Sequence, residues 1–147
     1  MPPQAPLATI KSLDHLVLTV SSLSRTLSFY SRLGMVHEIF STPSGSERHA
    51  LVFGTQKINI HVRGREFDPK ARNVMPGSAD LCFLVEEDVR EVWERLKSAG
   101  LSQGENQEEL RMDVLQMDDG QEVLDRTGAR GKLRSLYLRD PDGNLIE

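Results

Sequence analysis

Apolar and polar residues alternate along the first half of the chain in a pattern that predicts one strand, one helix and three further strands. Leu16, Leu18 and Val20 alternate with their neighbours, which predicts a strand with one more apolar face. Serines at 21 and 22 can cap the helix that follows, apolar residues at 23, 27 and 30 share one of its faces, and Gly34 ends it. The three later strands are predicted over 35–41, 48–53 and 57–62.

The same order begins again after residue 78. A strand over 79–85 precedes a helix whose apolar stripe includes Trp93 and which ends at Gly100. Pro141-Asp142-Gly143 predicts a tight turn between the last strands. Phe29, Tyr30 and Trp93 are interpreted as core side chains. The remaining strands are predicted over 101–103, 133–139 and 144–147.

Two segments interrupt this order. The segment 63–78 contains Pro69 and Pro76 and has no clean period, so it is interpreted as a linker or a lid. The acidic insertion 104–119 is polar, and its part 110–117 is either a short helix or a loose chain. Thr127-Gly128-Ala129-Arg130-Gly131 is either a backbone nest for an anion or a plain flexible loop.

The halves are therefore two copies of one β-α-β-β-β unit. His15 and Asp80 begin the first strand of each copy, 65 positions apart, and the helix-ending glycines differ by 66. An offset of 86 sets His61 against Glu147 at the end of the last strands, and the insertion accounts for the difference. The predicted fold is α+β: a single domain over 10–147, with modules at 10–62 and 79–147, that forms an open eight-stranded cupped sheet.

Composition limits the function classes. The length of 147 residues suits one domain, and 18 basic against 22 acidic residues give a net charge of −4, which argues against nucleic-acid binding. No apolar run is long enough to span a bilayer. The only cysteine, Cys82, excludes an internal disulfide, and residues 1–9 are interpreted as a disordered tail without a secretory signal. A cytoplasmic protein is expected.

Four repeat-related positions carry residues that bind divalent metals: His15, His61, Asp80 and Glu147. Strand alternation turns the apolar neighbours toward the helices and sends these four side chains to the opposite face. The alternative is ordinary, because a histidine in a strand is more often a half-buried or hydrogen-bonded side chain than a ligand. By the same alternation, the candidate substrate-wall residues are Lys57, Asn59, Tyr137 and Arg139.

Several stretches resemble the vicinal-oxygen-chelate (VOC) superfamily, which includes glyoxalases, fosfomycin-resistance proteins and extradiol dioxygenases. They are Asp14-His15-Leu16-Val17-Leu18-Thr19-Val20, Ser28-Phe29-Tyr30 with Leu33-Gly34, Phe53-Gly54-Thr55-Gln56-Lys57-Ile58-Asn59-Ile60-His61, Pro76-Gly77-Ser78-Ala79-Asp80-Leu81 and Asp140-Pro141-Asp142-Gly143-Asn144-Leu145-Ile146-Glu147. Together they look like the type called glyoxalase domain-containing protein 5 and its bacterial relatives.

The resemblance implies a cup around one divalent ion (Zn, Ni, Mn, Co or Fe) in a homodimer, sometimes with modules exchanged between subunits. His15, His61 and Glu147 fall on ligand positions, and Glu147 doubles as proton acceptor. Asp80 stands where relatives carry histidine, so it is a fourth ligand, a partner that orients a histidine, or no part of the site. Glyoxalase I uses a glutamate at the place of His61, which puts its reaction in doubt for this chain.

The expected function is that of a metal-dependent lyase or isomerase acting on a small oxygen-rich substrate. Thiol transfer or epoxide opening, as in the fosfomycin-resistance relatives, is one alternative. A non-catalytic binding protein is another. An Fe(II) dioxygenase fits two histidines and a carboxylate, although such enzymes commonly have four modules where this chain has two.

Overall fold

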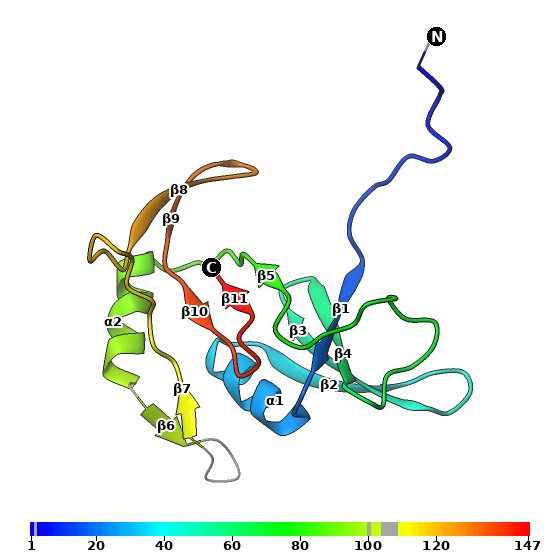
Figure 1. Cartoon of the computed structure of the whole chain (residues 1–147), viewed down its shortest axis with the longest axis horizontal. Coiled ribbons are helices and arrows are strands. Elements are labelled where there is room, and N and C mark those ends of the chain that lie inside the picture. The colour runs from blue at the N-terminus through cyan, green and yellow to red at the C-terminus, as the bar shows by residue number, and fades with distance from the viewer. Residues whose placement is uncertain (2, 100, 104–108) are drawn as a thin grey trace.

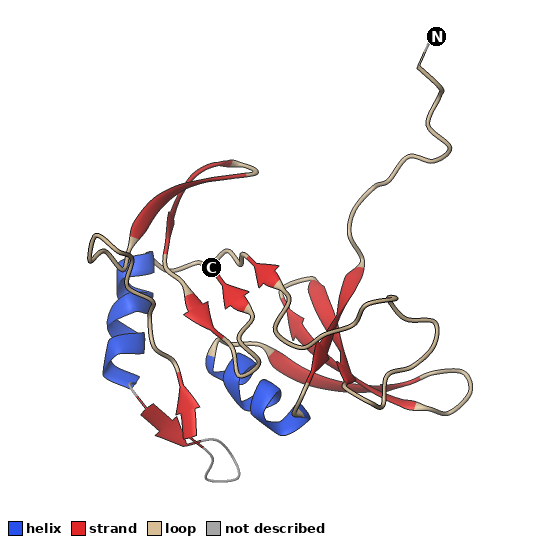
Figure 2. Cartoon of the chain, in the orientation of Figure 1, coloured by secondary structure: helices blue, strands red, loops and turns tan. Residues whose placement is uncertain are grey.

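The computed structural model describes residues 1, 3–99, 101–103 and 109–147. Figures 1 and 2 show how the helices and the short and long strands are arranged. In chain order the elements are β1 His15–Val20, α1 Leu23–Arg32, β2 Val36–Ser41, β3 Glu47–Phe53, β4 Gln56–Val62, β5 Asp80–Leu81, α2 Val89–Ala99, β6 Leu101–Gln103, β7 Glu109–Arg111, β8 Leu124–Gly128, β9 Gly131–Ser135, β10 Leu138–Arg139 and β11 Leu145–Ile146.

The first half folds as its residue pattern predicts. Strands β1–β4 form one sheet in the order β1-β4-β3-β2, in which β1 and β4 run parallel. The side chain of Ser22 caps α1 by accepting the backbone N–H of Arg25 at 3.4 Å. Phe29 and Tyr30 are fully buried, so their interpretation as core residues is confirmed. They pack with β1 and β4 in one hydrophobic cluster.

The second half repeats the strand order of the first with shorter strands. Its sheet has the order β10-β11-β5, in which β5 and β11 run parallel, as β1 and β4 do. Strand β5 covers two residues, whereas the sequence predicts seven. Within the described residues the strands form separate sheets of four, three, two and two strands. The predicted eight-stranded cup is therefore not one hydrogen-bonded sheet.

A hairpin replaces the loop predicted around Thr127–Gly131. Strands β8 and β9 pair antiparallel, with Thr127 opposite Lys132 and Gly128 opposite Gly131. Both the nest and the flexible loop are therefore wrong for this segment. Its side chains alternate poorly between apolar and polar, which is why the sequence pattern misses the pairing.

The acidic insertion contributes to the core. Its residues 104–108 lie outside the described part of the chain, and β7 pairs with β6. A helix over 110–117 is wrong, because β7 and an extended segment occupy that range. Leu110 and Met112 are only 2% and 3% exposed. Burial of these two side chains fixes the path of a segment that looks merely polar in sequence.

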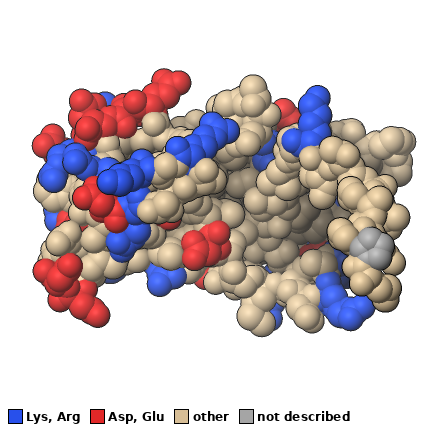
Figure 3. All heavy atoms as spheres, turned by 90° about the horizontal axis from the view of Figure 1, so that it is seen from above, with Lys and Arg blue, Asp and Glu red and all other residues tan. Residues whose placement is uncertain are grey.

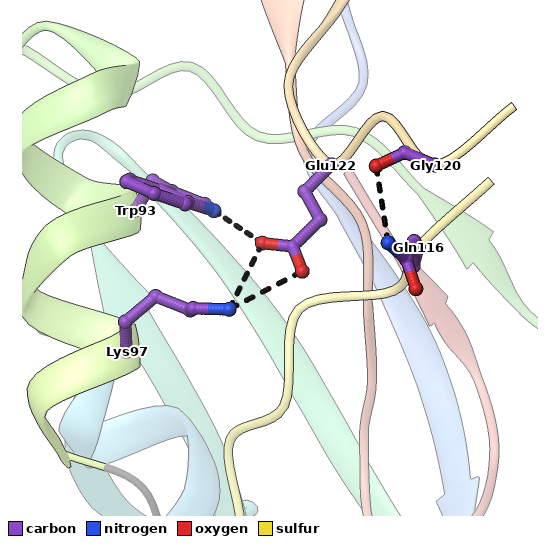
Figure 4. A network of polar contacts seen from close by, with 5 residues as sticks. All are labelled: Trp93, Lys97, Gln116, Gly120 and Glu122. Atoms are coloured by element: carbon purple, nitrogen blue, oxygen red, sulfur yellow. Dashed lines mark hydrogen bonds and ion pairs between the residues drawn. The ribbon is translucent and has the colours of Figure 1, made fainter.

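Hydrogen bonds connect helix α2 to the segment that follows the acidic insertion. Glu122 accepts hydrogen bonds from the indole N–H of Trp93 at 2.6 Å and from Lys97 at 3.2 Å (Figure 4). The Trp93 hydrogen bond, more than Lys97, holds the pKa of Glu122 below its usual value. Trp93 thus packs at the edge of the core and uses its polar atom on the surface.

Buried polar contacts connect the halves at the turn between β10 and β11. The hydroxyl of Tyr30 in the first half donates to Asp140 in the second at 2.8 Å. Within the second half, the backbone N–H of Ala79 donates to the fully buried Asn144 at 2.8 Å, which anchors the same turn. Phe53 and Phe83 meet edge to face at 5.4 Å between ring centroids. The relative position of the two sheets therefore depends on this turn.

The N-terminal segment before β1 forms no helix or strand where the structure describes it, and Figure 1 shows it extending away from the rest of the chain. Its apolar side chains Leu7 and Ile10 are exposed. No helix among the described residues has the length and apolarity to cross a bilayer.

Candidate functional site

The face of the first sheet turned away from α1 carries four of the predicted site residues, which are His15, Lys57, Asn59 and His61. Leu18, Ile58 and Ile60 join the core cluster under α1. Their strand neighbours point to the other side, here called the open face. His15 and His61 both lie on it, as alternation predicts.

The register of β1 against β4 separates these two histidines. His15 lies opposite Lys57, and His61 lies opposite Thr19, four positions further along β1. At about 3.3 Å per residue, this places the two backbone positions roughly 13 Å apart. The two histidines are therefore not neighbours on the sheet, and no group of three possible metal donors among the described residues includes them.

The two registers also revise the repeat. Asp80 lies opposite Leu145 as His15 lies opposite Lys57. Lys57 and Leu145 are therefore equivalent, at an offset of 88 rather than 86. The counterpart of Glu147 is then Asn59, and His61 falls two residues beyond it.

His15 is held by its neighbour in the sequence. Its Nδ1 lies 2.7 Å from a carboxylate oxygen of Asp14, and its side chain is 41% exposed. This hydrogen bond is the main reason why the pKa of Asp14 lies below its usual value. A carboxylate on one ring nitrogen directs the other nitrogen outward, which is the arrangement that metal-binding histidines use.

Ile146 joins the core cluster and Leu81 packs against it, and the opposite face is called the open face of the second sheet. Glu147 and Cys82 form a pair on this face. Backbone hydrogen bonds from Glu147 to Leu81 and from Phe83 to Glu147 set Glu147 opposite Cys82. Partial burial of the thiol, then the charge and hydrogen bond of Glu147, raise the pKa of Cys82. Asp80 adds a smaller effect of the same sign.

Tyr137 extends this open face, and Arg126 reaches it from the hairpin. Leu138 pairs with Ile146, so Tyr137 is the next residue opposite Glu147. Arg126 donates from Nε to the Tyr137 hydroxyl at 3.1 Å. The sequence pattern singles out Tyr137 but not Arg126, because Arg126 reaches the site only through the unpredicted hairpin. Arg139 instead donates to the backbone oxygen of Gly143.

A cavity of about 780 Å³ reaches the same pair of residues, Cys82 and Glu147. Its walls come from the end of α1, the segment 82–89, helix α2, the β8–β9 hairpin and strand β10. Most of the lining is apolar, and charged side chains border it. The apolar lining includes Met35, Phe53, Phe83, Leu96, Leu136 and Leu138. A small organic molecule fits a space of this size and character.

The other predicted wall residues lie on the first sheet. Lys57 makes a distant ion pair with Glu38, 3.9 Å between charged atoms, and lies 4.1 Å above the ring of Phe40. Asn59 has a buried oxygen without a hydrogen-bond partner. Lys57 is therefore occupied within its own sheet, whereas Asn59 has an unused acceptor.

His61 belongs to a polar group under the segment 63–78. Arg48 lies opposite it on β3, and the ring of Phe67 covers both: it lies 2.9 Å from the guanidinium carbon and 5.4 Å from the centre of the imidazole. Burial, and then the positive charge of Arg48, lower the pKa of His61. The segment 63–78, interpreted as a linker or a lid, thus contacts the first sheet through Phe67.

Charged residues of both signs are interleaved on the surface. Figure 3, a view from above, shows acidic and basic side chains side by side at one end and no continuous basic surface on that face.

The class of protein to which this fold belongs follows from comparison with known families. The family profile of the Glyoxalase/Bleomycin resistance protein/Dioxygenase superfamily matches residues 12–147. The chain therefore belongs to this superfamily. It is 42% identical over 139 residues to the glyoxalase domain-containing protein RDO1 of Mycosarcoma maydis. The aligned residues cover 95% of this chain and 68% of that protein.

Solved structures agree with this assignment. The chain is similar to the crystal structure of virulence protein STM3117 from Salmonella typhimurium, with a TM-score of 0.74, 41% identity and 95% of each chain covered. It is also similar to an integron cassette protein of V. cholerae, with a TM-score of 0.73, 42% identity, and 95% and 94% of the chains covered.

Members of this superfamily often depend on a metal, so we tested whether the residues fit one. The types at His15, Asp80 and Glu147 are suitable donors. Within the part of the chain that the structure describes, however, no three His, Cys, Asp or Glu side chains are grouped so that they could hold an ion. Among its described residues, one chain therefore does not group enough donors for a metal.

Proposed function

We propose that this protein is a glyoxalase-type lyase or isomerase that acts on a small oxygen-rich molecule at the open face of the second sheet. The observation that carries the proposal is the placement of Glu147 opposite both Cys82 and Tyr137, with Cys82 and Glu147 also lining the apolar cavity. A carboxylate in such a place is a suitable base for a proton on a carbon next to a carbonyl group.

Tyr137 supplies the complementary charge stabilisation. Arg126 donates to its hydroxyl oxygen, so the hydroxyl proton is free to point to a substrate oxygen. Negative charge that develops on this oxygen during proton removal is stabilised by the donor and by the nearby guanidinium. Glu147 and Tyr137 thus have the roles of proton acceptor and oxyanion donor.

The divalent ion is a separate part of the proposal, because it requires two copies of the chain. We propose a homodimer in which His15 of one copy and Asp80 and Glu147 of the other supply the donors. These residues would hold the ion, which would supply Lewis-acid stabilisation of negative charge on a substrate. His61 is left out of this set because of its position four residues beyond His15.

The test is an activity assay of purified protein on hemithioacetals and epoxides, with Zn, Ni, Mn, Co and Fe(II) supplied separately. Turnover of a hemithioacetal supports the proposal, and turnover of an epoxide with a thiol supports the fosfomycin-resistance type instead. Glu147→Gln should reduce turnover by roughly 10²- to 10⁴-fold. Glu94→Gln, an exposed change on α2, is the matched control and should leave it unchanged.

A second candidate is a binding protein without catalysis. The apolar cavity and the absence of a three-donor group among the described residues of one chain favour it. Tight capture of an apolar ligand, with no turnover on any substrate and no gain from any ion, would establish the binder and refute the enzyme.

A further inference from the structure

We propose that Arg48, Asn59 and His61, called here the Arg48 cluster, bind a small carboxylate that carries a hydroxyl group on the adjacent carbon. The cluster lies on the open face of the first sheet, beneath Phe67. Within one chain it lies on a different sheet from Glu147, and its test does not depend on the proposed reaction.

The first argument is hydrogen bonding. Among the side chains that the structure describes, three buried nitrogen or oxygen atoms have no partner: Nη1 of Arg48, Oδ1 of Asn59 and Nδ1 of His61. Buried polar groups are nearly always paired, so each such atom requires an explanation. Here one explanation serves for three, because the cluster occupies neighbouring positions on two adjacent strands.

The strand registers show where the Arg48 cluster lies on the first sheet. Arg48 is the residue opposite His61, and Asn59 is the next residue on the same face of β4. On the other side, Thr19 of β1 lies opposite His61 and is only 7% exposed. Backbone pairing on both sides of β4 therefore keeps the three residues next to one another on this face.

The donors and acceptors define the ligand. Arg48 is permanently charged and donates, so Nη1 calls for an anionic oxygen. The Asn59 oxygen can only accept, so it calls for a hydroxyl or amine donor. His61, whose pKa is lowered by burial and by Arg48, accepts or donates as a neutral ring. An anionic oxygen beside a hydroxyl satisfies both the donor and the acceptor, and a 2-hydroxy carboxylate carries this pair on adjacent carbons.

Phe67 covers the Arg48 cluster. Phe67, from the segment after β4, stacks on the Arg48 guanidinium and meets the His61 ring edge to face. A ligand held between this ring and the sheet is shielded from water, which strengthens its charged hydrogen bond to Arg48. Phe67 must shift when the ligand enters, and it stands at the surface end of the site.

The test is calorimetric titration of the full chain with glycolate, acetate and inorganic phosphate, together with ¹⁵N NMR of the His61 ring. We expect glycolate to bind and to shift the His61 ring signals. The hydroxyl should make glycolate roughly two- to tenfold tighter than acetate. Arg48→Met should abolish binding of both carboxylates, and Asn59→Ala should remove only the preference for glycolate.

Arg65→Met is the matched control, because it removes an exposed charge from the neighbouring segment and should leave all constants unchanged. Should Arg48→Met fail to fold, the Asn59→Ala variant and the glycolate-to-acetate ratio decide the question. Phosphate binding as tightly as glycolate, or an Asn59→Ala variant that keeps the preference, overturns the assignment. No binding and no His61 shift would show that ordered water alone satisfies the cluster. Since none of these measurements uses turnover, failure of the enzyme proposal leaves their result intact.

Discussion

The thiol of Cys82 and the carboxylate of Glu147 influence one another on the open face of the second sheet. Because the pKa of Cys82 is raised, little reactive thiolate forms near neutral pH, and the thiol should react slowly with iodoacetamide. Glu147→Gln removes the nearby negative charge, which should lower this pKa and accelerate alkylation at pH 8. Rates measured from pH 7 to 10 give the pKa directly. Equal rates in wild type and Glu147→Gln, with Glu94→Gln as control, would contradict the pairing.

His61 gives a pH dependence of stability with a definite sign. Its pKa is below the usual 6.5 in the folded protein, so the unfolded chain binds more protons as the pH falls through that value. The free energy of unfolding should therefore decrease on acidification below about pH 6.5. In His61→Gln this part of the decrease is absent. Urea denaturation at pH 8 and pH 5 measures it; an identical loss in both proteins would refute the assignment.

The sequence pattern predicts which residues lie on the open face, but it does not predict their relative positions along paired strands. Alternation places His15 and His61 on the same face because the side-chain period of a strand is two. Their separation depends on how β1 pairs with β4, which the intervening residues do not encode. A repeat alignment fixes this register only if it is correct to the residue, and an offset wrong by two exchanges Asn59 for His61.

At the scale of elements, the turn between β10 and β11 is the joint between the halves. Tyr30→Phe removes the hydroxyl that donates to buried Asp140, and hydrogen bonds to charged groups contribute about 1.5–3 kcal/mol. We expect a loss of that size in the free energy of unfolding, measured in urea. Tyr137→Phe, at the chain's other tyrosine, should cost much less because that hydroxyl is half-exposed. Equal losses would show that the Asp140 contact is not a joint.

Gly77 tests the approach of the segment 63–78 to the same turn. It has a positive φ of 85°, and a Cβ built there would lie 2.4 Å from the backbone oxygen of Asp142. Gly77→Ala therefore combines backbone strain with a clash, and the turn must shift. Gly64→Ala is the control, since its φ of 82° is similar and its surroundings are open.

Strain alone costs about 1–2 kcal/mol, so Gly64→Ala should lose about that much. Gly77→Ala should lose more, as measured by urea denaturation of both. Equal losses would show that the turn yields without cost.

Local pattern predicts the elements of the first half well and those of the second half poorly, for a physical reason. Strands β2–β4 are six or seven residues long, and in β4 the buried Ile58 and Ile60 alternate with less buried neighbours. Strands β5, β10 and β11 cover two residues each, too few for a period to be recognised. Leu110 and Met112 enter the core from a polar stretch, which only tertiary packing decides.

At the scale of the whole molecule, a metal site would need donors from two copies of the chain. One chain does not group three donors among its described residues, and His15 lies on the first sheet whereas Asp80 and Glu147 lie together at the second. If a symmetric pair of chains forms the site, each ion takes His15 from one copy and Glu147 from the other. His15→Ala and Glu147→Ala should then each lose the ion when purified alone.

Mixing the two variants distinguishes this arrangement from a site within one chain. After unfolding and refolding together, a mixed dimer has one site that lacks both residues and one that lacks neither. Random pairing should therefore restore about a quarter of the wild-type ion content, because half of the dimers are mixed and each of those has one intact site. A site built within one chain gives no restoration. Elemental analysis of the dimer fraction after gel filtration measures the outcome, and restoration requires that the donors come from different copies.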